Sequence, residues 1–407
     1  MHEQAFAAQC ASVSSHASAD EHPQGRLTLL ALALGSFCIG TSEFMSMGVL
    51  QLFAADLGLS LPQATHVITA YAIGVLVGAP LITLLAARLN RRPLLLLLMA
   101  LFLVGNLLSA IAPNPWTLMV ARFVAGLPHG GYFGAGAVVA GYVVGPNQSG
   151  RAFAIVMTGL TVATILGSPI ATFLGQHLSW RDAYLAVTGL GVLALLALWL
   201  WTPRTNALRG APVLQELRAL TKPAVLLMMA VAAFGIGSIF AVYTFIGPFI
   251  TEVNHADASL IPWALALFGI GMTAGNLLGG RLADAHPILG LGGGYCATLV
   301  VLAVLAFGGG NLGVLLACLF GVGAFMMIAI PAIQVRLTRF APEAPTLMGA
   351  MNLAALNVAN AIGAWAGGVS IGLGYGLLSP AWAGFACTSA GLLLFALSLA
   401  GSRGSKP

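Results

Sequence analysis

Residues 27–50 read LTLLALALGSFCIGTSEFMSMGVL, an apolar run of 24 residues in which Glu43 is the one charged side chain. A transmembrane helix needs about 20 consecutive apolar residues, so this run is long enough to cross a bilayer. The whole chain of 407 residues has the same character, because 59% of it is hydrophobic, 7% is charged and the mean hydropathy is +0.96. Soluble proteins are about 25% charged. The composition therefore excludes a cytosolic enzyme, a secreted disulfide scaffold and a disordered chain, and it indicates that the lipid bilayer is the solvent.

At about 30–35 residues per span and loop, the length suggests about twelve transmembrane helices. We expect an all-α membrane protein in which the twelve helices form two parallel six-helix repeats. Residues 1–25 are polar and have no basic segment leading into a short apolar one, so we expect a tail and no cleaved signal peptide. The apolar runs lie near 27–50, 64–86, 94–112, 116–143, 152–174, 183–201, 224–250, 260–280, 288–309, 311–334, 346–371 and 380–401. The expected parts are a disordered cytoplasmic tail at 1–26, an N-terminal bundle at 27–201, a cytoplasmic linker at 202–223, a C-terminal bundle at 224–401 and a cytoplasmic tail at 402–407.

The positions of Lys and Arg predict the orientation of these spans, because cytoplasmic loops carry an excess of both. With the N-terminus inside, fourteen basic residues fall on the cytoplasmic side, Arg181 falls outside and Arg122 lies within a span. We therefore expect a multi-pass protein of the plasma (inner) membrane with both termini in the cytoplasm. This topology accounts for the net charge of +5, so no nucleic-acid partner is expected. The fourteen residues are Arg26, Arg88, Arg91, Arg92, Arg151, Arg204, Arg209, Arg218, Lys222, Arg281, Arg336, Arg339, Arg403 and Lys406.

The two halves of the chain repeat at an offset of 197 residues. Corresponding spans keep the same orientation, which is the arrangement of parallel repeats. A nearly constant offset through five spans is more than chance similarity between Gly/Ala/Leu-rich segments. The matched pairs include Gly74 and Gly271, Gly78 and Gly275, Phe123 and Phe320, and Gly126 and Gly323.

Two charged residues lie well inside predicted spans, Glu43 and Arg122. Charge in lipid is costly and usually faces a functional cavity. By helix rise the two lie about 10 Å and about 9 Å from the outer ends of their spans, so they can share one cavity. In such a cavity the carboxyl of Glu43 can gain and lose a proton as access alternates. The alternative is a static ion pair that joins two helices, but Phe240 and Leu319 occupy the equivalent positions of the second half, whereas an architectural pair would be expected in both halves.

His129 follows Arg122 on the same span, before the pair Gly130-Gly131. An imidazole titrates near pH 6.5 when unperturbed, so His129 is either a proton relay or a neutral residue bonded to a neighbouring helix. Two stripes of glycine at a spacing of four residues predict close helix contacts. They are Gly126, Gly130 and Gly134, and Gly271, Gly275 and Gly279.

Amide and aromatic side chains inside the spans are the remaining candidates for substrate contact. Amides avoid lipid, so they are expected to face protein or a cavity, with bonding between helices as the alternative. The aromatic residues are either walls of a pocket or simple packing and interface anchors. The amides are Asn276, Asn352, Asn357 and Asn360, and the aromatic residues are Tyr132, Phe133, Tyr243 and Phe245.

No motif for a cofactor or a catalytic reaction is found in the sequence. The five cysteines are scattered without metal-ligand spacing, and there is no Walker sequence, HExxH or GxSxG. We therefore expect no enzyme activity, no catalytic residue, no metal and no cofactor, and an ion gradient as the energy source. The tails and loops are too short for a signalling or nucleotide-binding domain, which argues against a sensor or an ATP-driven pump.

Over residues 27–400 the chain resembles the major facilitator superfamily, in particular the arabinose-efflux-permease-like branch of the drug:proton antiporters with twelve spans. The segments that carry this resemblance are Thr41-Ser42-Glu43-Phe44 with Met47-Gly48, Arg122 to Gly130, Gly159 to Ala163 with Gly167-Ser168-Pro169, and Asn357 to Gly363. The antiporter signature of the fifth span has Gly-Pro where this chain has Gly167-Ser168-Pro169, and a kink is still expected there.

The superfamily also has a cytoplasmic loop motif that locks one conformation through Asp and Arg residues. Its first copy here keeps Arg88, Arg91 and Arg92 but has Ala87 in place of the Asp. The second copy keeps Asp284 and loses the basic end. The resemblance therefore implies a lock formed by these residues that is weakened or shared between the halves.

The resemblance implies export of a small molecule, drug, sugar or nucleoside-like, in exchange for protons, by rocking of two six-helix bundles around a central cavity. Glu43 would carry the proton, Arg122 would return Glu43 to its charged form, and His129 would assist the proton transfer. The protein would act as a monomer with a small-molecule substrate, protons and the lipid bilayer as its partners, and it would belong to the drug-resistance transporters. The alternative is an uncoupled uniporter or importer of a small polar solute.

Overall fold

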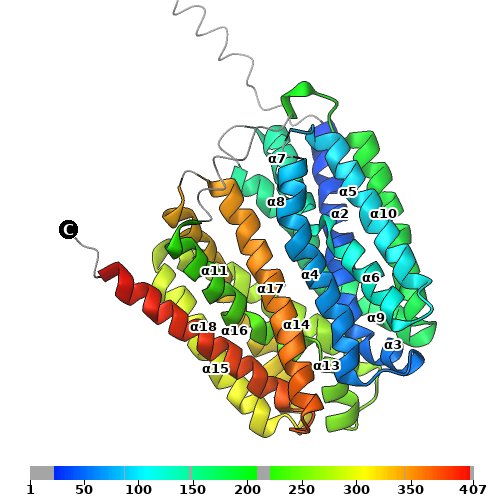
Figure 1. Ribbon diagram of the computed structural model, residues 1–407, viewed down its shortest axis with the longest axis vertical. Helices are drawn as coiled ribbons and strands as arrows, with labels where there is room; N and C mark the ends of the chain where they lie inside the picture. Colours follow the sequence, from blue (N-terminus) through cyan, green and yellow to red (C-terminus); the bar gives the residue numbers. More distant parts are fainter. Residues whose placement is uncertain (1–22, 87, 146–148, 209–220, 343, 404–407) are drawn as a thin grey trace, which may run out of the picture.

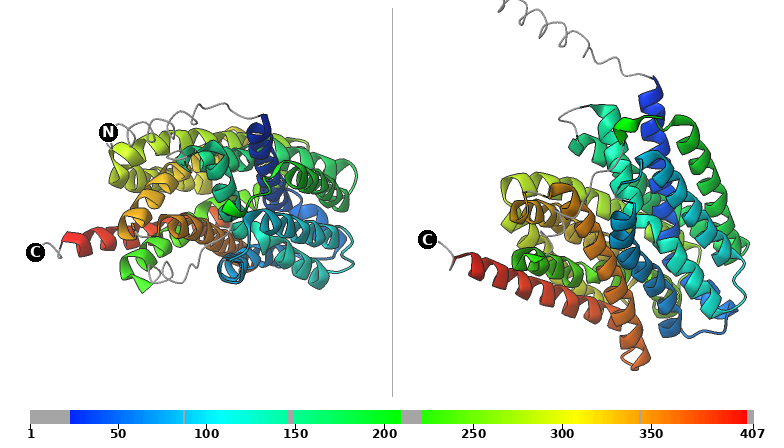
Figure 2. Two further views of the ribbon diagram at one scale, coloured as in Figure 1. Left: turned by 90° about the horizontal axis from the view of Figure 1, so that it is seen from above. Right: turned by 45° about the horizontal axis from the view of Figure 1, so that its top comes forward.

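The computed structural model describes residues 23–86, 88–145, 149–208, 221–342 and 344–403, and all elements assigned in this part are helices (Figure 1). The helices before residue 202 and those after residue 222 form two groups that lie side by side (Figure 2). This confirms the predicted all-α fold of two six-helix halves. Most of the predicted tail at 1–26 and the part of the linker at 209–220 lie outside the described residues.

The N-terminal half contains ten elements, because two of its six spans are interrupted and a short helix follows the first span. They are α2 (Pro23–Gly48), α3 (Leu50–Asp56), α4 (Leu61–Leu85), α5 (Arg91–Ala110), α6 (Pro115–Gly126), α7 (Pro128–Val144), α8 (Ser149–Val162), the π-helix η1 (Ala163–Gly167), α9 (Ser168–His177) and α10 (Trp180–Trp201). A short 3-10 turn, η2 (Asn206–Leu208), follows.

The C-terminal half has one interrupted span at its start and five continuous helices. Its elements are α11 (Pro223–Gly235), α12 (Gly237–Tyr243), α13 (Ile246–Pro248), the π-helix η4 (Phe249–Val253), α14 (Leu260–Ala285), α15 (Pro287–Gly308), α16 (Leu312–Phe340), α17 (Pro345–Gly372) and α18 (Ser379–Arg403).

Eleven helical stretches of the described chain are long and apolar enough to cross a membrane. The twelfth predicted span is the pair α6 and α7, which is split at Leu127 into segments of 12 and 17 residues. Pro128 explains the break, since proline has no N–H to continue the hydrogen bonding of the helix. The kink expected in the fifth span takes the form of the π-helix η1, which ends two residues before Pro169.

Several helices begin about three residues before the predicted apolar runs, because polar caps precede them. Ser60 accepts from the backbone N–H of Gln63, whose side chain bonds back to Ser60, so α4 begins at Leu61 rather than near 64. Asn90 likewise accepts from the N–H of Arg92 at the start of α5. Hydropathy alone misses such ends, because the first turn of a capped helix is amphipathic or polar.

The glycines that define the sequence repeat make the same helix contact in both halves. A Cβ placed on Gly74 of α4 would meet the carbonyl oxygen of Phe123, and one on Gly271 of α14 would meet that of Phe320. Gly271 and Phe320 lie 197 residues after Gly74 and Phe123, which is the offset of the sequence repeat. The repeat is therefore an equivalence of packing as well as of sequence, with α14 against α16 as the counterpart of α4 against α6 and the start of α7.

The second glycine stripe is confirmed, since Gly271, Gly275 and Gly279 all lie against backbone of α16. The first stripe is confirmed at Gly126 and Gly130, which lie against α4. It is wrong at Gly134, where an added Cβ would meet no atom within 4 Å.

We expect Gly275→Ala to destabilise the protein, because its Cβ would collide with the carbonyl of Ala324 and push α14 away from α16. Overpacking of this kind costs about 1–3 kcal/mol. Thermal melting of the purified protein in detergent measures the loss. Gly280→Ala on the same helix is the matched control, since its Cβ would meet nothing within 4 Å. Equal melting temperatures for the two variants would contradict the contact.

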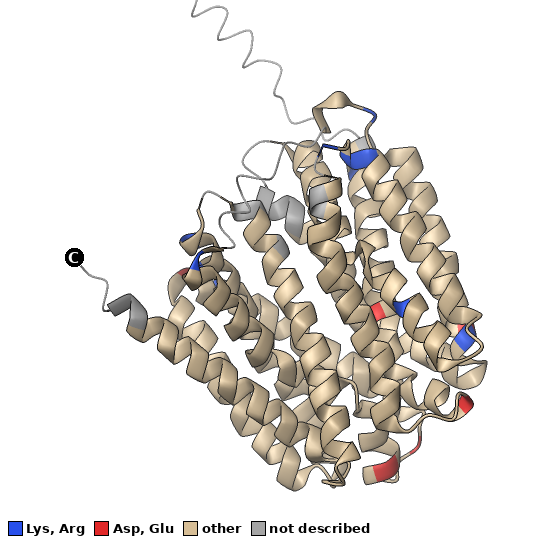
Figure 3. Cartoon of the chain, in the orientation of Figure 1, with Lys and Arg blue, Asp and Glu red and all other residues tan. Residues whose placement is uncertain are grey.

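Charged side chains are distributed unequally between the two ends of the molecule (Figure 3). Most of the described Lys and Arg lie at the end where α4 meets α5, here called the basic end, and most of the described Asp and Glu lie toward the opposite, acidic end (Figure 3). The acidic end includes Asp56 at the end of α3, and Glu252 and Asp257 between the start of η4 and the start of α14. Most of the described basic residues from which the orientation is predicted therefore lie at one end of the molecule.

At the acidic end, Asp56 ties the end of α3 to the start of α10. Arg181 and the indole Nε1 of Trp180 both donate to its carboxylate, the latter over 3.1 Å. Arg181 also donates to the carbonyl of Ala112 and stacks on the Trp180 ring, 4.2 Å from its centre. The guanidinium of Arg181, followed by the indole, holds the pKa of Asp56 below its usual range.

This lowered pKa predicts a pH dependence of stability. The contribution of Asp56 is present above its unfolded pKa of about 3.9 and is lost as the pH falls through the lower folded pKa. We expect the wild type to melt above Asp56→Asn at pH 6, by at most about 1 kcal/mol since the pair is solvent-exposed. The difference should shrink toward zero as the pH falls from about 3.9 through the lower folded pKa. A constant difference across this range would contradict the role of the carboxylate.

Candidate functional site

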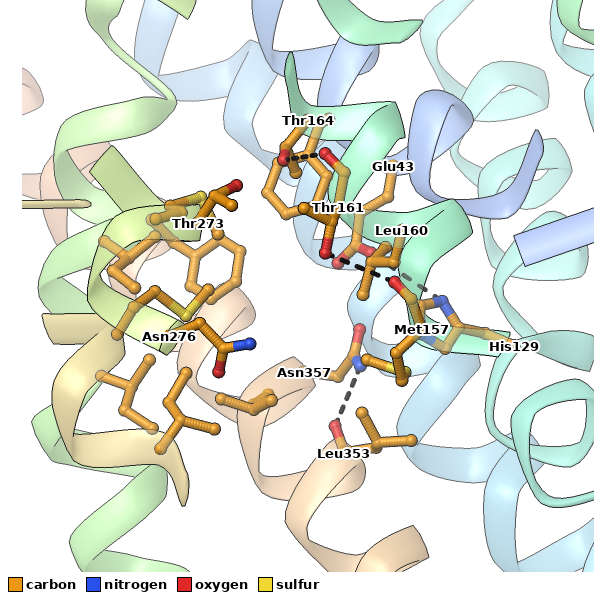
Figure 4. Close-up of a pocket in the computed structure, with 18 residues that line it drawn as sticks. Glu43, His129, Met157, Leu160, Thr161, Thr164, Thr273, Asn276, Leu353 and Asn357 are labelled. Carbon is orange, nitrogen blue, oxygen red and sulfur yellow. Dashed lines mark hydrogen bonds and ion pairs between the residues drawn. The ribbon is translucent and has the colours of Figure 1, made fainter. Parts of the chain in front are cut away.

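A cavity of about 150 Å³ lies between the two halves and is lined by both (Figure 4). Glu43 and Phe44 of α2, His129 of α7, and residues of α8 and η1 form the N-terminal wall. The C-terminal wall is formed by α12, α14, α16 and α17 with mostly aliphatic and thioether side chains. The two walls therefore differ in chemistry, one carrying the acid and the imidazole and the other being largely apolar.

Glu43 is the one carboxylate among the residues that line this cavity, and it is 6% exposed. Its Oε1 accepts a hydrogen bond of 3.0 Å from the amide of Asn360 on α17. This bond joins the two halves of the protein at the centre of the molecule. A carboxylate is a stronger acceptor than a neutral carboxyl, so the strength of the connection depends on whether Glu43 carries a proton.

His129 lies beside Glu43 and extends the polar cluster into the N-terminal half. Its Nδ1 is 3.8 Å from Oε2 of Glu43 and 3.0 Å from the hydroxyl of Tyr71. Phe133 packs against the imidazole with ring centres 5.1 Å apart. The structure thus brings Glu43 and His129 together, as a relay would require, and adds Tyr71, which the sequence analysis did not single out.

Arg122 does not line the cavity, although its depth matches that of Glu43. Its guanidinium donates to the hydroxyl of Ser42 at 2.9 Å, to the carbonyl of Ser42 at 3.1 Å and to Asn106 Oδ1 at 3.5 Å. It also lies over the rings of Tyr71 and Tyr184, 4.5 and 5.3 Å from their centres. Among the described residues the ion pairs within 4.0 Å do not join Glu43 to Arg122, so the static ion pair that we considered is not formed.

The predicted aromatic residues lie outside the cavity. Tyr132, Phe133, Tyr243 and Phe245 are fully buried and are not among its lining residues. Tyr132 donates to the carbonyl of Leu32, and Tyr243 is 3.0 Å from the hydroxyl of Ser168 in the opposite half. Of the aromatic residues, Phe44 and Phe240 do line it and stack on each other across the halves at 6.4 Å.

The amides are divided between the cavity and its surroundings. Asn357 and Asn276 line the cavity, from α17 and α14 respectively. Asn360 does not line it and instead holds Glu43. Sequence reasoning missed Ser42 and Asn106, which surround Arg122, and the three methionines of the cavity wall. Hydroxyls and thioethers are so common in transmembrane helices that nothing in the sequence distinguishes these positions.

The residues of the predicted loop lock are not paired with one another. Arg92 donates to the carbonyls of Trp199 and Thr202 at 2.6 and 3.1 Å, and Arg91 donates to that of Ala86 at 3.3 Å. Arg88 and Asp284 are exposed, and within the described chain neither forms an ion pair. At the basic end these basic side chains therefore bind their own half.

At the acidic end, by contrast, hydrogen bonds join the two halves. Gln51 of α3 donates to Thr251 at 3.0 Å and to Glu252 at 2.8 Å. Gln176 of α9 donates to the carbonyl of Ala258 at 2.8 Å. The helices of the two halves approach one another toward this end and diverge toward the basic end (Figure 1). The residues that the structure describes contain no group of three His, Cys, Asp or Glu that could hold a metal ion.

Twelve spans in two equivalent halves around a central cavity define a membrane transporter. The model of the Major Facilitator Superfamily matches residues 32–364, and the chain belongs to this family.

Relatives agree with this assignment over most of the chain. It is 42% identical over 350 residues to the inner membrane transport protein YdhP of Escherichia coli (strain K12), covering 85% of this chain and 90% of that protein. It is 34% identical over 372 residues to a chloramphenicol resistance protein of Streptomyces lividans, covering 90% and 95%. Its fold is similar to that of a bacterial homologue of the human lysosomal transporter Spinster, solved in an inward-facing and occupied conformation, with a TM-score of 0.71, 16% identity and coverage of 92% and 96%.

Proposed function

We propose that the protein exports a small molecule across the plasma (inner) membrane in exchange for protons. The observation that carries this proposal is the hydrogen bond from Asn360 to Glu43, since it connects a group that binds protons to the opposite half of the transporter. Protonation of Glu43 weakens this bond and thereby changes the relative free energies of the conformations in which the two halves are arranged differently. A proton gradient can act on the conformation through this group.

The excess of Lys and Arg supports an orientation in which the basic end and both chain termini lie on the cytoplasmic side. In this orientation the end that Gln51 and Gln176 join between the halves faces outward. An exporter takes up its substrate from the cytoplasm, so we expect the substrate to reach the cavity from the basic end. Reorientation would break these outer bonds and allow the loop residues Arg88, Arg91, Arg92 and Asp284 to form the cytoplasmic lock.

The proton follows a path through the N-terminal wall. Glu43 accepts a proton from outside when the cavity faces outward, which displaces the substrate, and releases it inside after reorientation. His129 and Tyr71 lie within reach to pass it on. Arg122 is bonded to Ser42 of α2 outside the cavity. It favours the charged form of Glu43, which returns the transporter to the start of its cycle. One chain contains all these groups, so the monomer is the working unit.

The alternative is an uncoupled uniporter or importer, in which Glu43 binds a polar solute. Proteoliposomes that contain the purified protein and a trapped pH-sensitive dye distinguish the two. Chloramphenicol is a suitable first substrate, because a relative is named for resistance to it. We expect addition of chloramphenicol to cause a proton flux that protein-free vesicles lack. Transport of chloramphenicol without any proton flux would favour the uniporter.

A further inference from the structure

Some of the polar side chains that line the cavity already have hydrogen-bond partners within the protein, and others do not. The hydroxyls of Thr161, Thr164 and Thr273 each donate to a backbone carbonyl three or four residues earlier in their own helix. Glu43 is bonded by Asn360 and approached by His129. These groups are therefore engaged within the protein before any ligand arrives.

Only one of the two polar atoms of the Asn357 side chain has a hydrogen-bond partner. Its Nδ2 donates to the carbonyl of Leu353 at 3.0 Å, and because a carbonyl can only accept, the oxygen of the amide must face the other way. This Oδ1 is buried and has no hydrogen-bond partner, while the whole residue is 4% exposed. The side chain projects into the cavity (Figure 4). A buried acceptor without a partner is unfavourable, so a ligand that brings a donor to this point is favoured.

Asn276 adds a second free amide on the same wall. It lies on α14, and its side chain projects into the cavity toward Asn357 (Figure 4). The hydrogen bonds of the described chain include none made by Asn276. Two amides from different helices of the C-terminal half therefore present hydrogen-bonding groups to one space.

The surroundings of these amides restrict the rest of the ligand. Ile239, Phe240, Met272, Met327 and Ile330 form an apolar surface around them, with thioethers that adapt to different shapes. The carboxylate of Glu43 on the opposite wall disfavours an anion, and no lining residue is Lys or Arg.

We infer that Asn357 and Asn276 recognise a hydroxyl or amide N–H of an uncharged, amphipathic substrate whose apolar part packs on the C-terminal wall. This inference rests on the proposed function in one respect, that the central cavity is the substrate site. It specifies the class of substrate and the residues that determine the specificity, neither of which follows from proton exchange.

Binding to the purified full chain in detergent tests the inference, with thermal stabilisation and calorimetry as the readouts. The probes are chloramphenicol, an uncharged aromatic compound with hydroxyl and amide donors, tetraphenylphosphonium, a cation without a donor, and 4-nitrobenzoate, an anion. We expect chloramphenicol to bind more tightly than tetraphenylphosphonium, which offers no donor to Asn357, and more tightly than 4-nitrobenzoate, which the carboxylate of Glu43 repels. Phenyl β-D-glucoside, also uncharged and rich in donors, is the second member of the expected class.

Asn357→Leu should weaken binding of the uncharged probe about tenfold, the upper range for one hydrogen bond. Asn352→Leu is the matched control, because Asn352 is a buried amide on the same helix that does not line the cavity. If Asn357→Leu does not fold, Asn276→Leu serves in its place, since that residue is exposed.

Failure of both uncharged probes, preference for a charged probe, or equal affinity of the Asn357 and Asn352 variants would overturn the inference. The binding assay needs no proton gradient, so its result is independent of coupling. Probe binding without proton flux would contradict the proposed function alone, and proton flux driven by tetraphenylphosphonium would contradict this inference alone.

Discussion

Glu43→Gln should reduce substrate-driven proton flux to the level of vesicles without protein. Glutamine has the shape of glutamate and its oxygen can still accept the hydrogen bond from Asn360, but it cannot bind and release a proton. The variant therefore keeps the connection between the halves and loses the group that a pH gradient acts on. The measurement is dye-reported proton flux in proteoliposomes during transport of chloramphenicol.

Asp257→Asn is the matched control, because it makes the same exchange of carboxylate for amide at an exposed site outside the cavity. We expect it to retain the flux of the wild type. Melting temperatures of both variants close to that of the wild type would show that a loss of flux is not a loss of fold. If Glu43→Gln retained full pH-driven transport, Glu43 would not be the proton carrier.

The fold was largely predictable from the sequence, because the bilayer imposes it. Apolar runs of about 20 residues have few alternatives to a spanning helix. The offset of 197 residues predicted parallel repeats, and Gly74 and Gly271 show that helices matched by this offset also pack equivalently. The interruptions were harder to predict. Pro128 is a signal for the break in the fourth span, whereas Gly167 and Pro169 predicted a kink in the fifth span but not the π-helix at Ala163–Gly167.

The sequence predicted how deep the charged residues of the site lie in the membrane, but not the direction in which their side chains point. Helix rise placed Glu43 and Arg122 at the same level, and the structure buries both and bonds Arg122 to Ser42, the neighbour of Glu43. Successive residues of a helix, however, point about 100° apart. Ser42 faces Arg122 while its neighbour Glu43 faces the cavity, so two groups at one depth have different surroundings. The rotation of each helix about its axis is decided by its neighbours, which the sequence of a single chain does not reveal.

The geometry around Arg122 makes a prediction that separates a functional charge from a structural one. Two neighbouring aromatic rings and the acceptor oxygens of Ser42 and Asn106 hold the guanidinium. In Arg122→Met the hydroxyl of Ser42 still donates to Asn106 Oδ1 at 2.6 Å, so these two partners of the guanidinium keep a hydrogen bond to each other. We therefore expect Arg122→Met to melt close to the wild type and to lower proton-coupled transport about tenfold or more, which matches the loss of charge-assisted hydrogen bonds.

Arg122→Lys keeps the charge but not the planar set of donors that bonds both the hydroxyl and the carbonyl of Ser42. If the charge acts on Glu43, this variant should recover part of the flux that Arg122→Met loses. If Arg122 only holds α2 in position, both variants should melt well below the wild type, and the lysine should restore neither stability nor flux. Measuring melting and flux on the same three preparations decides between the two roles, because only the electrostatic role predicts low flux at unchanged stability.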